Sequence, residues 1–156
     1  MTQPRGGTST PVITTPDDQA SIPFLGALLR LRAGSEHTGG TFALLEHTGE
    51  RGYMSPLHLH RDDEETFLVL EGELRVEVGD DRHQVGPGGL ALLPRDLPHG
   101  FVVVSPQARF LTLHTPGGFE RFVAKAAAHG EPLGPDELTR LAAEFGVEIV
   151  GPPLLP

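Results

Sequence analysis

Two histidines separated by one residue open the stretch HLHRDDEE, which runs from His58 to Glu65. In a β-strand, residues i and i+2 point to the same face, so the imidazoles of His58 and His60 project together. Two imidazoles in that arrangement can bind one metal ion, each at roughly 2.1 Å. The chain continues as ETFLVLEG, where alternation places Glu65 and Phe67 on one face and Glu64 on the other. Only one glutamate can therefore face inward beside the histidines, and alternation alone does not decide which one.

The same stretch has a plainer interpretation. A single His-x-His on a strand is usually two half-exposed polar residues, and RDDEE by itself is typical of a solvated turn. The elements around the stretch must therefore decide between a surface turn and half of a metal site.

Those elements are short apolar runs separated by turn residues, from about residue 24 to residue 115. The runs are GALLRLR, TFALLEH, ETFLVLEG, ELRVEVG, LALLP, HGFVVVS and RFLTLHT, and GDD, GPGG, PRDLP and SPQ separate several of them. Evenly spaced short strands predict an all-β sandwich or small barrel. The segment ETFLVLEGELRVEVG is predicted to form a hairpin that turns at Glu71 and Gly72.

The two ends of the chain differ from this central region. Residues 1–22 are rich in Thr, Pro, Ser and Gly, which predicts a mostly disordered tail with at most one edge strand. Residues 23–115 form the predicted barrel. Residues 116–156 contain two amphipathic helical patterns and a short strand or extended arm, which we expect to pack outside the barrel or on a partner chain.

Composition excludes several classes of protein. The 156 residues contain no cysteine, so disulfides, thiolate metal sites and a cysteine nucleophile are excluded. A formal net charge of -9 argues against a nucleic-acid partner or an anionic membrane surface. The sequence has neither a membrane-length apolar run nor a signal-peptide pattern at its N-terminus, which predicts a cytoplasmic protein.

The spacing of glycines around the histidines resembles the first motif of the cupin family, G-x5-H-x-H-x3,4-E-x6-G. Gly52, His58, His60, Glu65 and Gly72 occupy its fixed positions. Both glutamates satisfy the variable spacer, but only Glu65 stands six residues before Gly72. The resemblance therefore selects Glu65 as the inward-facing carboxylate.

The second cupin motif, G-x5-P-x-G-x2-H-x3-N, matches from Gly88 to Val103 and contributes His99 as a third histidine. Asp96 replaces the second glycine of the motif, and Val103 replaces its asparagine. Asp is among the few residues that tolerate turn conformations where glycine is usual. Neither departure touches an expected ligand.

The resemblance implies a small double-stranded β-helix barrel, or jelly roll, with His58, His60, Glu65 and His99 as metal ligands. Three neutral imidazoles and one carboxylate suit one divalent transition metal, and ligand type alone does not choose among Fe, Mn, Ni, Co, Cu and Zn. The resemblance favours Fe, Mn, Ni or Co over Cu or Zn. Four protein ligands leave one or two positions open for substrate, water or dioxygen.

Within the cupins, residues 25–125 are most similar to single-domain proteins that resemble quercetin 2,3-dioxygenase. This likeness implies a dioxygenase for a small hydrophobic or phenolic substrate, with Glu65 as the catalytic group that takes the hydroxyl proton, and it implies a homodimer. The alternatives are a cupin isomerase, decarboxylase or cyclase, or a non-catalytic cupin that binds a small molecule.

The expected substrate pocket is the apolar interior of the barrel. His47 and His114 each end an apolar run and could contact a substrate there or lie on the rim of the barrel. The candidate wall residues, which depend on strand parity, are Phe67, Val69, Leu92, Phe101 and Phe110.

Overall fold

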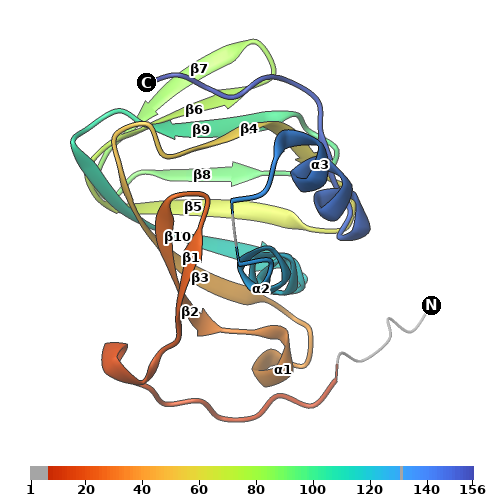
Figure 1. Cartoon of the computed structure of the whole chain (residues 1–156). Helices are drawn as coiled ribbons and strands as arrows, with labels where there is room; N and C mark the ends of the chain where they lie inside the picture. Colours follow the sequence, from red (N-terminus) through yellow and green to blue (C-terminus); the bar gives the residue numbers. More distant parts are fainter. Residues whose placement is uncertain (1–6, 131) are drawn as a thin grey trace.

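The computed structural model describes residues 7–130 and 132–156, which fold into two facing antiparallel sheets (Figure 1). The first sheet contains, in spatial order, β1 (Ser21–Phe24), β2 (Ala27–Ala33), β3 (Ala43–Glu50), β10 (Gln107–Thr115), β5 (Glu64–Glu71) and β8 (Leu90–Leu93). The second contains β11 (Val147–Ile149), β4 (Met54–His60), β9 (His99–Val103), β6 (Leu74–Val78) and β7 (Asp81–Val85). The predicted all-β jelly-roll barrel is confirmed.

The core lies between the two sheets and follows from the two-residue alternation of each strand. On β5, Glu65, Phe67 and Val69 are buried while the residues between them are only partly so. Phe67 and Phe110 are at most 1% exposed, and burying each such ring contributes roughly 1.5–3 kcal/mol. The same alternation turns Leu92 of β8 outward, where it is 62% exposed. The expectation that Leu92 lines the interior is therefore wrong.

The turn at Glu71 and Gly72 does not form the predicted hairpin. β5 pairs with β10 and β8, whereas β6 pairs with β9 and β7, so this turn carries the chain from one sheet to the other. Gly72 has a φ of 77°, and a Cβ atom there would lie 2.2 Å from the carbonyl oxygen of Gln107. The sequence correctly predicted a turn at these two residues, but turn residues do not show which strands pair across the barrel.

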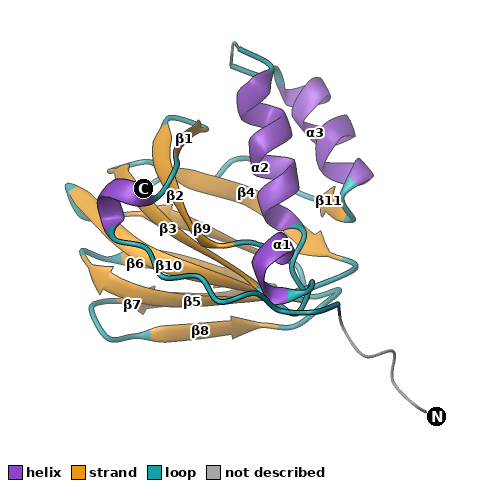
Figure 2. Ribbon diagram, turned by 90° about the horizontal axis from the view of Figure 1, so that it is seen from below, coloured by secondary structure: helices purple, strands orange, loops and turns teal. Residues whose placement is uncertain are grey.

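The two predicted C-terminal helices are α2 (Phe119–Ala128) and α3 (Pro135–Glu144), which lie side by side in Figure 2. α2 packs on β1, where Phe122 meets Phe24 edge-to-face with ring centroids 5.7 Å apart. α3 packs on α2 and on β11, the short strand predicted near the end of the chain. The helices therefore cover the barrel on the side of β1 and β11, and β11 pairs directly with the histidine-bearing end of β4.

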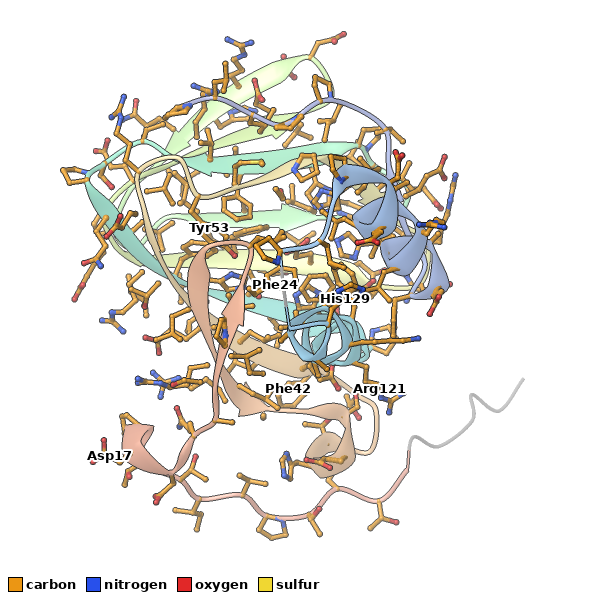
Figure 3. The ribbon with its side chains drawn as sticks, viewed as in Figure 1. Asp17, Phe24, Phe42, Tyr53, Arg121 and His129 are labelled. Carbon is orange, nitrogen blue, oxygen red and sulfur yellow. The ribbon has the colours of Figure 1, made fainter. Side chains whose placement is uncertain are left out.

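The N-terminal segment is only partly within the described residues. Residues 7–20 contain a single 3-10 turn, η1 (Pro16–Asp18), which carries Asp17 at the periphery of Figure 3. This segment is attached to α1 (Ser35–Thr38), because the Thr10 amide donates to the carbonyl of His37. β1 begins at Ser21, within the predicted tail. Disorder of residues 1–22 remains a prediction, and residues 1–6 lie outside the described residues.

Among the described residues, no helix is long and apolar enough to cross a membrane.

Candidate metal centre

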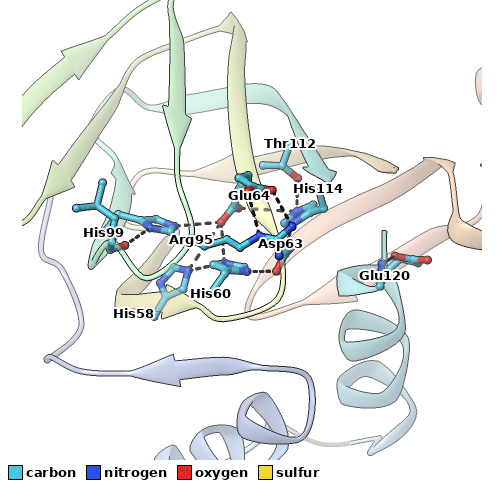
Figure 4. Close-up of polar contacts among 12 residues, drawn as sticks. His58, His60, Asp63, Glu64, Arg95, His99, Thr112, His114 and Glu120 are labelled. Atoms are coloured by element: carbon cyan, nitrogen blue, oxygen red, sulfur yellow. Dashed lines mark hydrogen bonds and ion pairs between the residues drawn. The ribbon is translucent and has the colours of Figure 1, made fainter. Parts of the chain in front are cut away.

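Four candidate ligands from both sheets meet at one end of the barrel. His58 and His60 come from β4, and His99 lies directly opposite His58 on β9. Glu65 comes from β5 in the other sheet. One potential ligand atom of each residue lies within 4.8 Å of those of the other three, and all four side chains are buried. Figure 4 shows the three histidines His58, His60 and His99 close together. The structure thus brings together the four residues that the sequence motifs select.

The distances show that these atoms converge on one point. The Oε2 atom of Glu65 lies 2.9 Å from Nε2 of His60, 3.1 Å from Nε2 of His99 and 3.9 Å from Nε2 of His58. The Nε2 atoms of His58 and His60 are 3.1 Å apart. All three imidazoles therefore present the same ring nitrogen to the carboxylate.

The opposite nitrogen of each ring is held by an acceptor. Nδ1 of His58 lies 2.7 Å from the carbonyl oxygen of Pro56, and Nδ1 of His99 lies 3.0 Å from that of Leu97. Because a carbonyl oxygen only accepts hydrogen bonds, these Nδ1 atoms carry the proton, and the neutral rings turn an Nε2 lone pair toward the centre.

This donor set fits a divalent cation. Neutral imidazoles that each offer an Nε2 lone pair, together with one carboxylate, are the ligands that first-row transition metals bind. With both rings neutral, the lone pairs of His58 and His60 would face each other across 3.1 Å and repel unless a cation or a proton lies between them.

Without a metal, a proton takes that position. Burial alone lowers the pKa of His60, but the carboxylates of Glu65 and Asp63 outweigh burial and raise it to about 10. Burial likewise raises the pKa of Glu65, but His60 and the other imidazoles hold it well below its ordinary value. Glu65 is therefore ionised, and a metal has to displace the proton on His60 in order to bind.

Asp63 is a functional candidate that the sequence analysis placed in a solvated turn. It is only 8% exposed, and its two oxygens each accept a hydrogen bond, from Nδ1 of His60 and from Nδ1 of His114, both at 2.9 Å. A carboxylate behind a metal-binding histidine fixes the ring and strengthens it as a ligand. The signal in the sequence is the position of Asp63 three residues after His60, which is too common to single out.

The other residues singled out in the two motifs do not belong to the ligand cluster. Glu64, the other glutamate, forms an ion pair with Arg95 on the surface, whereas Glu65 is 5% exposed. Asp96, at the position of the motif glycine, has a φ of 61°, which is a conformation that favours glycine. Val103, at the position of the motif asparagine, is fully buried in the core.

The candidate pocket residues fill the barrel interior rather than line an open cavity. His47 stacks on Phe110 at 4.7 Å, and Phe101 packs edge-to-face on the same ring at 5.2 Å. Of the six candidates, His114 comes closest to the metal centre, with its Nε2 atom 3.9 Å from Oε1 of Glu65. A role in substrate binding remains a prediction for all six residues, which are His47, Phe67, Val69, Phe101, Phe110 and His114.

An apolar hollow of about 50 Å³ lies against His58. Phe119 and Phe122 of α2, Ala142 of α3 and the turn at Leu25 form much of its wall. From the sequence, the two helices were expected only to pack outside the barrel or on a partner chain. Their amphipathic pattern could not reveal that one wall of a hollow at the metal centre comes from them.

Comparisons with known proteins agree with this architecture. Residues 45–114 match the family model described as a cupin domain. The chain is also 31% identical over 80 residues to quercetin 2,3-dioxygenase of Bacillus subtilis (strain 168). That alignment covers 51% of this chain but only 24% of the relative, so the chain spans about a quarter of that enzyme.

Solved structures share the fold at low sequence identity. KdgF from Halomonas sp. superposes with a TM-score of 0.62 at 18% identity, over 69% of this chain and 96% of KdgF. An RmlC-like cupin from Shewanella frigidimarina gives 0.63 at 15% identity, over 72% and 96%. The polyketide cyclase RemF from Streptomyces resistomycificus gives 0.58 at 26% identity, over 68% and 80%. The matched family model, the two sheets and these structural relatives identify residues 45–114 as a cupin domain.

Proposed function

We propose that this protein is a metal-dependent cupin enzyme whose metal ligands are His58, His60, His99 and Glu65. The observation that carries the proposal is the convergence of three Nε2 atoms and one ionised carboxylate on a buried point beside an apolar hollow. A surface turn with half-exposed histidines would not hold all three rings by their Nδ1 atoms. The proposed cofactor is one divalent transition metal, and by the resemblance to cupins Fe, Mn, Ni and Co come before Cu and Zn as candidates.

The proposed reaction is a dioxygenation of a small hydrophobic or phenolic molecule, as in quercetin 2,3-dioxygenase. A bound divalent ion would act as a Lewis acid on a phenolic oxygen and offer an open position to dioxygen. The apolar wall next to His58 favours an uncharged aromatic ring over a charged one, because a charged group would lose its hydration there.

Glu65 is the proposed proton acceptor. Its Oε2 atom faces the three ligand histidines, while Oε1 lies on the side of His114 and is free to receive the hydroxyl proton of the substrate. Without a metal, the charged His60 holds the pKa of Glu65 well below its ordinary value, so Glu65 is ionised. A carboxylate accepts a proton more readily from an acidic hydroxyl group, such as a phenol or an enol, than from an alcohol.

Oxygen uptake with reconstituted protein tests this proposal. Metal-free protein loaded in turn with Fe, Mn, Ni and Co is supplied with flavonols and related enolisable phenols under air. Oxygen uptake and carbon monoxide release with wild type, both lost in Glu65→Gln, would support the dioxygenase. Stoichiometric metal binding without oxygen uptake on any of these substrates would refute it.

A cyclase is the second candidate, because the polyketide cyclase RemF is the structural relative cited above with the highest identity, 26%. The same metal centre and the same apolar wall would then bind an aromatic or polyketide substrate without using dioxygen. Conversion of such a substrate under nitrogen at the rate seen under air would favour the cyclase.

We also propose that the protein is a homodimer. Leu90 and Leu92 of β8 are 61% and 62% exposed, and β8 is the edge strand of the first sheet. Exposed apolar side chains on an edge strand favour association with another chain. Light scattering should give twice the mass of the chain for wild type and a lower mass for Leu92→Glu.

A further inference from the structure

A row of hydrogen-bonded side chains runs from the metal centre through the interior of the barrel. It connects Asp63, His114, Thr112, His47 and Tyr53 in that order, and we call these five residues the polar row. Asp63 follows the end of β4 at His60, whereas Tyr53 precedes the start of β4. The row therefore spans the barrel from the metal end to the opposite end, where Tyr53 lies in the interior (Figure 3).

Each link of the row is a short contact between buried atoms. Nδ1 of His114 lies 2.9 Å from Oδ2 of Asp63, and its Nε2 lies 3.3 Å from the hydroxyl of Thr112. The same hydroxyl lies 2.9 Å from Nε2 of His47, whose Nδ1 lies 2.8 Å from the hydroxyl of Tyr53. Phe67, Phe101 and Phe110 form the apolar core beside these groups (Figure 4 shows the end of the row at the metal centre).

The direction of every proton in the row follows from the anion at one end. An ionised carboxylate only accepts, so Asp63 accepts from the Nδ1–H of His114, and Nε2 of that ring faces the hydroxyl of Thr112 as an acceptor. Thr112 has a single hydroxyl proton, and it donates that proton to Nε2 of His114. The hydroxyl oxygen must then accept from Nε2 of His47.

The other end of the row completes the same order. Burial lowers the pKa of His47 to about 3, so this ring is neutral and its Nδ1 atom is an acceptor. Burial also raises the pKa of Tyr53, so its phenol keeps the proton and donates it to His47. Every donor thus points toward Asp63, and both nitrogens of each histidine in the row are used.

We propose that Tyr53, His47 and Thr112 are positioning residues that set the orientation of the metal ligand His60 through His114 and Asp63. None of the three touches the metal centre. The hydroxyl of Thr112 holds the His114 ring from its Nε2 side, which keeps the Nδ1–H of His114 on Asp63. Asp63 in turn accepts from the Nδ1–H of His60, so that Nε2 of His60 faces the ion. This inference rests on the proposed metal centre.

The hydrogen bonds of the polar row, and not only the packing of its side chains, hold His114 in position. Without the hydroxyl of Thr112, Nε2 of His114 has no donor in the row and the Nε2–H of His47 has no acceptor in it. The His114 ring is then held by Asp63 alone, so it can turn and its hydrogen bond to Asp63 weakens. Asp63 would be released from its second partner, and His60 would be held less firmly.

The test compares Thr112→Val, which removes the hydroxyl and keeps the shape, with Thr112→Ser, which keeps the hydroxyl. Two-bond proton–nitrogen correlation spectra of histidine-labelled, zinc-loaded protein report which nitrogen of each ring carries the proton. Zinc affinity is measured by competition with a chromophoric chelator. Val76→Ala, a buried core change in β6 outside the row, controls for a general loss of packing.

We expect wild type and Thr112→Ser to carry the His114 proton on Nδ1 and the His47 proton on Nε2. Thr112→Val should lose this pattern at His47, whose Nε2–H then has no acceptor in the row. It should also bind zinc about 3–10-fold more weakly, at or below the lower end of the effect of removing a direct partner of a ligand. Tyr53→Phe should show a smaller change in the same direction, and Val76→Ala should show neither change.

Two results would overturn the inference. One is a wild-type spectrum with the His47 proton on Nδ1, which is the opposite order. The other is a Thr112→Val variant that matches Thr112→Ser in both spectra and zinc affinity. If wild type binds no zinc at all, the proposed metal centre fails, whereas a normal wild type with an unaffected Thr112→Val contradicts the positioning role alone.

Discussion

Replacing Asp63 with Asn should weaken metal binding while leaving the shape of the site unchanged. The two side chains have the same size, so no cavity forms. Asp63 accepts hydrogen bonds at 2.9 Å from Nδ1 of both His60 and His114. An Asn side chain can offer its oxygen to one ring only, and its amide group then points N–H groups at the N–H of the other ring.

The expected size of the effect follows from these contacts. One charge-assisted hydrogen bond, worth about 1.5–3 kcal/mol, is lost, and a buried N–H is left without an acceptor. We therefore expect the free energy of unfolding of Asp63→Asn to fall by about 2–4 kcal/mol. Loss of a partner behind a metal ligand weakens metal binding by about 10–100-fold, or about 1.4–2.7 kcal/mol.

The assay is competition with a chromophoric chelator for Co and Zn, beside urea unfolding of the metal-free protein. Asp62→Asn is the matched control, because Asp62 is the preceding residue of the same turn and is exposed. It should bind metal as wild type does. If Asp63→Asn loses stability but binds metal within twofold of wild type, the orientation of His60 by Asp63 does not matter for the metal centre, and our reasoning about it is refuted.

Three further predictions address acid stability, the apolar wall and the turn between the sheets. The pKa of His47 in the folded protein is about 3, below its ordinary value of 6.5. Between these two pH values the unfolded chain binds a proton at His47 that the folded protein does not bind. The contribution of the neutral His47 to stability is therefore present above pH 6.5 and lost on acidification toward pH 3. Urea unfolding in the presence of chelator should therefore show a loss of about 1.4 kcal/mol per pH unit in that window that is absent in His47→Gln; equal slopes would contradict it. Phe119→Ala removes an aromatic wall of the hollow and should weaken binding of a phenolic substrate about 10-fold by calorimetry with metal content unchanged, and an unchanged affinity would exclude the hollow from substrate binding. Gly72→Ala should destabilise the protein by at least about 1–2 kcal/mol more than Gly79→Ala. Both glycines have a positive φ, but of the two only Gly72 would place a Cβ against backbone, 2.2 Å from the carbonyl oxygen of Gln107. Similar unfolding midpoints for the two variants would contradict this prediction.

Local periodicity was sufficient to predict most of the strands. The i, i+2 spacing of His58 and His60 places both rings on one face whatever the fold, because alternation within one strand is displayed directly by a sequence. The choice of Glu65 over Glu64, and the inward direction of the histidines, came instead from the resemblance to the cupin motif.

Features that depend on pairing between distant strands could not be predicted in the same way. The turn at Gly72 was visible, but its role as a crossing between sheets depends on β10 and β9, which come later in the chain. Asp63 looked like a surface residue because its second partner, His114, is 51 residues away. The outward direction of Leu92 likewise depends on its pairing with Thr66 of β5.

The most direct test of the metal centre is anomalous diffraction from crystals of the protein loaded with Co or Zn. The proposal predicts a single strong anomalous peak at roughly 2.0–2.2 Å from the Nε2 atoms of His58, His60 and His99 and from a carboxylate oxygen of Glu65. The peak should disappear in crystals of His99→Ala that still show the barrel. A metal-saturated protein whose anomalous peak lies elsewhere, or is coordinated through Asp63 and His114 instead, would contradict the account.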